Sequence, residues 1–147
     1  MNTTLPRAAT AVLAAGALAL LSACSGTSVL SLEVGQCITD TAQEGQVSSV
    51  PVVECTEPHN GEIYALPQLP EGDFPGDQAV KDQGDQQCAG QLFQDYVGVP
   101  YQQSEIYYTK LVPSAETWAD GDREIVCILA NQDGSPLSPG SLRGANR

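Results

Sequence analysis

The apolar positions between residues 29 and 66 favour β-strands. Residues 29–38 (VLSLEVGQCI) and 47–55 (VSSVPVVEC) are rich in β-branched side chains and are separated by a polar segment that contains glycine. Two such runs joined by a polar connection are typical of a β-hairpin. Asn60 and Gly61 then supply a turn before residues 62–66 (EIYAL). The pattern predicts three strands, of which the first two form a hairpin.

A helical pattern follows a loop that is rich in glycine and proline. Asp77 is placed to cap a helix that runs to about Val97, with Gly98 just beyond its end. Gly84 and Gly90 weaken this helix. Its apolar face consists of Val80, Cys88, Ala89, Leu92, Phe93 and Tyr96.

Two further strands are predicted after the helix. Residues 124–130 (EIVCILA) are apolar at both alternating sets of positions, which is typical of a central strand that is covered on at least one face. Residues 105–112 are its expected hairpin partner, and the segment between them holds Trp118. We favour packing at the edge of the core for Trp118 over stacking on a ligand. The predicted fold is α+β, a small antiparallel sheet with one main helix packed on it and two disulfides.

The N-terminus has the pattern of an export signal. Residues 8–23 are apolar and uncharged, and this run of 16 residues is shorter than the ~20 that span a bilayer. It ends in LSAC at 21–24, which resembles the bacterial lipobox. The resemblance implies cleavage before Cys24 and a lipid on its thiol. We therefore expect a lipoprotein signal peptide at 1–23 and a lipidated tether at 24–30, with an ordinary signal peptide as the alternative.

The lipid assignment explains the odd number of cysteines. With Cys24 set aside, four of the five remain, namely Cys37, Cys55, Cys88 and Cys127. Four cysteines outside the cytoplasm indicate two disulfides. The sequence has no C-x-x-C pair, the spacing that would indicate a metal site. Of three possible connectivities we favour the two pairs that are consecutive in sequence. Chain entropy then contributes about 3 kcal/mol for the shorter loop and about 4 for the longer.

The charge balance excludes nucleic acid as a partner. The chain has 18 acidic and 6 basic side chains, a net charge of −12, and removal of 1–23 gives 5 − 18 = −13. Phosphate binding requires clustered lysine and arginine. Anionic lipid should repel this domain, so its lipid rather than its surface is expected to hold it at the membrane. A solvated acidic surface is favoured over a face built to bind cations.

Apolar residues are not regularly spaced at the end of the chain. From Asn131 onward the sequence is rich in glycine, proline and serine, which is typical of disorder. We therefore expect a folded domain at 31–131 and a disordered tail at 132–147.

Several segments together resemble a known family. They are Gly35-Gln36-Cys37, the Cys-x-x-Pro-His-x-x-Glu pattern at 55–62, Cys88, and the segment 113–127 with its tryptophan before the last cysteine. This succession is similar to the septum-formation-related domain family of actinobacterial envelope proteins. The resemblance implies an extracytoplasmic domain, often anchored in the membrane and associated with division or envelope growth. It implies no catalytic residues.

His59 is the only histidine of the chain. We favour a structural role in which His59 and Glu62 brace the turn after the first disulfide by hydrogen bonds. A recognition loop that includes His59, Glu62 and Trp118 is the second interpretation, and chemistry at His59 is the third. No serine lies in a nucleophile-elbow pattern, and zinc requires more ligands than this loop offers.

Acidic residues alternate at Asp120, Asp122 and Glu124. Alternate carboxylates can bind calcium, but these residues do not follow the order of ligands in an EF-hand loop. We therefore favour a polar turn.

The sequence leads to one main hypothesis of function. We expect a lipid-anchored, noncatalytic binding or scaffold protein on the extracytoplasmic face of the cell membrane, which contacts envelope or division proteins. No metal or cofactor is expected. One alternative is an envelope hydrolase that uses His59 with a carboxylate. The other is a cation-binding structural protein of the surface.

Overall fold

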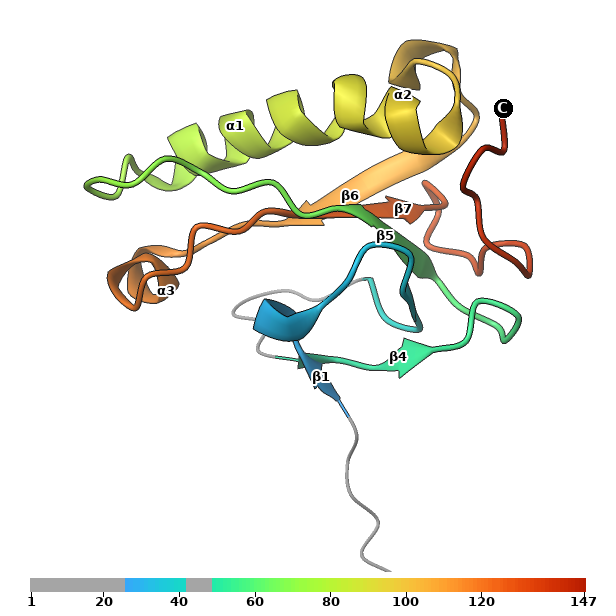
Figure 1. Ribbon diagram of the computed structural model, residues 1–147, viewed down its shortest axis with the longest axis horizontal. Helices are drawn as coiled ribbons and strands as arrows, with labels where there is room; N and C mark the ends of the chain where they lie inside the picture. The colour runs from blue at the N-terminus through green and yellow to red at the C-terminus, as the bar shows by residue number, and fades with distance from the viewer. Residues whose placement is uncertain (1–25, 42–48) are drawn as a thin grey trace, which may run out of the picture.

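The computed structural model of this protein describes residues 26–41 and 49–147. The elements are β1 (Thr27–Ser28), η1 (Val29–Ser31), β2 (Cys37–Ile38), β3 (Ser49–Val50), β4 (Val52–Val53), β5 (Gly61–Ala65), α1 (Asp77–Cys88), α2 (Gln91–Val97), η2 (Tyr101–Gln103), β6 (Tyr107–Leu111), α3 (Ala115–Ala119) and β7 (Val126–Ala130). Five strands form a sheet in the order β4-β2-β5-β7-β6. Helices α1 and α2 lie on one side of it and β1 on the other (Figure 1). The predicted α+β class is confirmed.

All pairings in the five-stranded sheet are antiparallel, and β7 lies between β5 and β6. Every residue of β7 is buried, as its apolar pattern predicts. Cys127 and Leu129 face the helices, while Val126 and Ile128 face the opposite layer, which includes Leu32. Burial on both faces therefore explains why both alternating sets of β7 are apolar.

The predicted helix is present as two helices that meet at an angle. Helix α1 ends at Cys88 and α2 begins at Gln91, with Gly90 as its N-cap. A Cβ on Gly90 would lie 2.7 Å from the carbonyl oxygen of Gln86, so glycine permits the break. The predicted cap is shifted by one position, because Gly76 is the N-cap of α1 and Asp77 is its first residue.

The predicted N-terminal hairpin is present as short pieces. Strand β1 pairs with β3 and β2 pairs with β4, both antiparallel. Residues 29–31 form a 3₁₀ turn in place of a strand, since the Ser28 side chain accepts a hydrogen bond from the Leu30 amide. The predicted tether at 24–30 is therefore shorter, because the folded domain already begins at Thr27. Cys24 and the signal at 1–23 lie outside the described residues.

Both disulfides have the predicted connectivity. Cys37 and Cys55 are joined with their Cα atoms 5.2 Å apart, and Cys88 and Cys127 with theirs 5.5 Å apart. The first bond fixes β2 to the loop that follows β4. The second joins the last residue of α1 to the central strand β7, and so holds the helical layer on the sheet.

The end of the chain is ordered, contrary to the predicted disordered tail at 132–147. We call residues 137–146 the C-terminal segment. Within it Leu137 and Leu142 are buried. The Leu137 amide donates to the carbonyl oxygen of His59 at 2.8 Å, and the Gly140 amide donates to that of Cys55 at 2.7 Å. Partners far away in sequence provide this order, which no local periodicity reveals. The predicted domain end at 131 is therefore too early.

Candidate functional site

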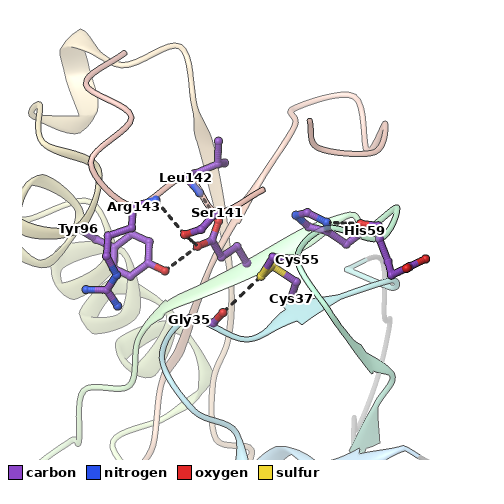
Figure 2. The surroundings of a disulfide bond; sticks show 10 residues. Gly35, Cys37, Cys55, His59, Tyr96, Ser141, Leu142 and Arg143 are labelled. Atoms are coloured by element: carbon purple, nitrogen blue, oxygen red, sulfur yellow. Dashed lines mark hydrogen bonds between the residues drawn. A yellow bond between two sulfur atoms is a disulfide. The ribbon is translucent and has the colours of Figure 1, made fainter. Parts of the chain in front are cut away.

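Glu62 is a fully buried carboxylate on β5, on the face that the helices cover. Its Oε1 accepts a hydrogen bond from the Tyr96 hydroxyl at 2.6 Å and another from the Ser141 hydroxyl. Its Oε2 accepts from the Leu142 amide at 2.6 Å. Figure 2 shows Tyr96, Ser141 and Leu142 converging on this carboxylate. Glu62 therefore fastens α2 and the C-terminal segment to the central sheet.

The Tyr96 ring completes this junction. Burial first, and then the hydrogen bond to Glu62, raise the pKa of Tyr96 to about 12. The Arg143 guanidinium lies 4.3 Å from the centre of the same ring, on its outer side. A phenol that keeps its proton up to such a pH is a permanent donor to the carboxylate. The described donors to the Glu62 carboxyl group are therefore two hydroxyls and one backbone amide.

His59 lies inside the protein, beneath the C-terminal segment. Its imidazole is fully buried, and its Nδ1 is 2.8 Å from the carbonyl oxygen of Glu57. A carbonyl can only accept, so Nδ1 is the donor in this contact. In the described part of the chain Nε2 has no hydrogen-bond partner. His59 thus makes a hydrogen bond within the turn after Cys55, as predicted, whereas the hydrogen bonds of Glu62 go to Tyr96 and the C-terminal segment and not to this turn. Direct recognition by His59 would require an accessible side chain.

Trp118 belongs to a different part of the molecule. It lies on α3, which Ser114 caps, and the predicted polar turn follows this helix at residues 120–121. The indole Nε1 donates to the carbonyl oxygen of Gly72 at 2.9 Å, Phe74 packs edge-on against the ring, and the Arg123 guanidinium covers the ring at 3.9 Å. Trp118 is thus a packing residue, as the favoured interpretation predicts. The predicted grouping with His59 and Glu62 is not formed, since α3 lies at the opposite end of the sheet from the loop between β4 and β5 (Figure 1).

The acidic residues after α3 bind partners within the protein. The Asp122 carboxylate accepts from the Glu124 amide at 3.0 Å, and the Glu124 carboxylate accepts from the Gln68 side chain at 2.8 Å. Burial, followed by the nearby Asp122, raises the pKa of Glu124. Residues 26–41 and 49–147 contain no cluster of three His, Cys, Asp or Glu side chains that could hold a metal ion.

A groove of about 280 Å³ runs between α1 and β6. Lys81 and Asp85 of α1 line one side, and residues 107–110 and Val112 line the other. Strand β6 is at the edge of the sheet and pairs with β7 alone among the described strands. An edge strand presents backbone N–H and C=O groups that can pair with another chain. The groove therefore combines an open sheet edge with side chains suited to binding.

Aromatic and basic residues gather at this groove. Tyr107 and Tyr108 line the groove with their ring centres 6.0 Å apart, and Tyr101 packs against Tyr108 with ring centres 4.8 Å apart. The Tyr107 side chain is 40% exposed. Both lysines of the chain, Lys81 and Lys110, also line the groove. With Asp85, the charged side chains of the lining sum to 2 − 1 = +1, in a chain whose net charge is −12.

Asp85 organises the wall of the groove. Its carboxylate accepts from the Tyr108 hydroxyl at 2.7 Å and forms an ion pair with Lys110. Burial alone would raise the pKa of Asp85, but the hydrogen bonds from Lys110 and Tyr108 outweigh it and hold this pKa below its usual value. Lys110 is thereby held in one position, while Lys81 remains exposed to solvent.

Gly84 explains how α1 approaches β6 so closely. A Cβ at this position would lie 2.8 Å from Lys110 Cδ and 3.0 Å from Val112 Cγ1. The glycine that weakens the predicted helix is therefore the point at which the side chains of Lys110 and Val112 pack on α1. Sequence reasoning missed this groove. The available signal was that both lysines fall in predicted elements, one in the helix and one in a strand next to two tyrosines.

Comparison with known proteins identifies the family of the chain. Residues 34–145 match the protein family described as septum formation. The chain belongs to the septum formation family. The matched range contains both disulfides, the Glu62 junction, the groove and nearly all of the C-terminal segment. No curated protein and no solved structure matches the chain.

Family membership associates the protein with septum formation and with a location in the cell envelope or outside the cell. Over the described ranges, no helix is long and apolar enough to span a membrane.

Proposed function

We propose that this member of the septum formation family is a lipid-anchored, noncatalytic binding protein of the cell envelope. It uses the groove between α1 and β6 to hold an extended, acidic segment of an envelope or division protein. The observation that carries this proposal is the open edge of β6, flanked by exposed tyrosine and by both lysines of the chain.

The edge of β6 suits an extended peptide. A chain that adds to a sheet edge gains backbone hydrogen bonds, and side-chain pockets beside the edge give it specificity. Tyr107, Tyr108 and the side chains around them form such pockets. Tyrosine is enriched at protein interfaces because its ring supplies a large apolar contact and its hydroxyl a hydrogen bond.

The charge distribution favours an acidic partner. The chain as a whole is strongly acidic, so an acidic segment is repelled from most of its surface and attracted where the lysines lie. Lys110 is engaged in its ion pair with Asp85, so the exposed Lys81 is the lysine of the groove that can turn to a partner. Pairing of β6 with the same edge of a second copy would bring these lysines together, which disfavours a dimer through this edge.

The anchor rests on the lipobox at 21–24. Two disulfides agree with an oxidising compartment outside the cytoplasm. We expect the wild-type chain in the membrane fraction with a diacylglyceryl mass increment on Cys24, and the Cys24→Ala variant in the soluble fraction or uncleaved. Unchanged membrane fractionation of that variant would contradict the anchor.

The groove is tested by photocrosslinking in living cells. A photoreactive amino acid at position 107 should form a covalent adduct with a partner, whereas one at position 133, in the exposed turn after β7, should not. Lys81→Glu should lower the adduct yield about fivefold, equivalent to about 1 kcal/mol. Arg147→Glu makes the same change in charge at a residue that does not line the groove, and it should leave the yield unchanged. Equal yields from positions 107 and 133, or no effect of Lys81→Glu, would contradict the proposal.

A further inference from the structure

Exposed large apolar side chains are concentrated near the N-terminus. In the described part of the chain three such residues are exposed: Leu30 at 70%, Val34 at 44% and Tyr107 at 40%. Tyr107 belongs to the groove. The other two lie in η1 and in the turn that follows it, within ten residues of Cys24.

The fold holds these two side chains outward. Strand β1 pairs with β3, and Leu32 is buried in the layer that covers the sheet on the side away from the helices. Val29 packs against the same layer. Leu30 and Val34 are therefore attached to the folded domain, and their exposure is a property of its surface.

The chain between the anchor and the fold is very short. Only Ser25 and Gly26 separate Cys24 from the first residue of β1, Thr27. Three steps of fully extended chain cover at most about 11 Å. A lipid on Cys24 would therefore hold β1 and η1 directly against the bilayer surface.

The charge of this segment also suits a membrane. Between residues 26 and 36 the only charged side chain is Glu33, in a chain with a net charge of −12. A single acidic side chain gives anionic headgroups little to repel in this segment. Apolar side chains next to a lipid anchor add their own buried surface to the attachment.

We propose that the surface formed by η1 and the turn at 34–35 rests on the bilayer that holds the lipid of Cys24, with Leu30 and Val34 in the headgroup region. This inference rests on the anchor in the proposed function. It fixes the orientation of the domain, because β1 and the helices lie on opposite sides of the sheet (Figure 1). Helix α1 and the groove beside it then face away from the membrane, where a partner can reach them.

The test uses the lipidated wild-type protein in phosphatidylcholine vesicles that contain a small fraction of photoactivatable phosphatidylcholine. After illumination, mass spectrometry maps the lipid adducts. We expect adducts on the peptide that covers 26–36 to exceed those on 107–112 about fivefold or more. The Leu30→Ser/Val34→Ser variant should lose most of the adducts on 26–36, with an unchanged circular dichroism spectrum, since both side chains are exposed.

Adducts spread equally over both peptides, or an unchanged pattern in the double variant, would overturn the inference while leaving the anchor in place. The intact mass of the same sample separates the two failures. If Cys24 carries no lipid, the mass shows this directly, and the proposed anchor and the orientation are both overturned.

Discussion

Replacing Tyr96 by phenylalanine tests the buried junction around Glu62. The substitution removes a single oxygen from a side chain that is 5% exposed. It leaves the ring, its neighbour Tyr64 at 6.0 Å between ring centres, and the overlying Arg143 in place. It therefore deletes the 2.6 Å hydrogen bond to the Glu62 carboxylate without disturbing the packing around the ring.

The expected cost follows from the charge of the acceptor. A hydrogen bond to a charged group contributes about 1.5–3 kcal/mol, against about 1 for a neutral pair. The Ser141 hydroxyl still donates to the same oxygen, which keeps the loss within this range. We therefore expect Tyr96→Phe to lower the free energy of unfolding by about 1.5–3 kcal/mol, which for a domain of this length corresponds to a fall in melting temperature of about 5–12 °C.

The assay is urea unfolding of the Cys24→Ala protein, which lacks the predicted lipid, together with trypsin cleavage after Arg143. Tyr96→Phe should lower the free energy of unfolding and speed that cleavage, because Glu62 holds the C-terminal segment less firmly. Tyr107→Phe is the control, since a substitution at a side chain that is 40% exposed should change stability by less than about 0.5 kcal/mol. Equal effects of the two substitutions would refute the reasoning.

Three other predictions test the fold. Replacing Cys88 and Cys127 by alanine opens a cross-link between residues 39 apart, and urea unfolding should show a loss of about 4 kcal/mol; a loss below about 1 would contradict it. Gly61→Ala places a Cβ 2.7 Å from Ile128 Cγ2, and thermal unfolding should show destabilisation by about 1–3 kcal/mol; an unchanged melting temperature would contradict this packing. The lowered pKa of Asp85 means that its ion pair stabilises the fold above its ordinary pKa of 3.8 and is lost as pH falls through the lower folded value. The stability difference between wild type and Asp85→Asn should therefore shrink only below about pH 4, and a difference already lost at about pH 6 would refute this.

Much of the sheet could be predicted from local patterns. Residues 126–130 are apolar on both faces, and the structure places them at the centre of the sheet. The turn signal at Asn60 and Gly61 also located β5, and the favoured pairing of consecutive cysteines is the one found for both disulfides. Each of these signals depends on neighbours in sequence or on a small number of pairings, so it can be read without coordinates.

The C-terminal segment could not be predicted in the same way. Its glycine, proline and serine residues have no apolar period, and its order comes from hydrogen bonds to distant groups. Leu142 donates to Glu62 across 80 positions of sequence. A composition rule detects the absence of a local pattern, but it does not detect a buried acceptor elsewhere in the fold.

The candidate site was missed for a related reason. The interpretation based on sequence selected His59, Glu62 and Trp118 because of their rarity or motif, and the structure buries all three. The groove depends on how α1 crosses the edge of the sheet, which Gly84 permits and no periodicity specifies. That both lysines and the tyrosines lie at one groove becomes visible only in the folded structure.

The central claim is that the edge of β6 holds an extended partner, and crosslink mapping from two positions of this strand tests it most directly. Photoreactive residues placed separately at positions 107 and 109 should each form adducts in dividing cells. If the partner adds as a strand, the two crosslinks should map to residues of one acidic segment that lie about two positions apart, as paired strands require. Crosslinks that map to scattered sites, or no adduct from either position, would contradict the account.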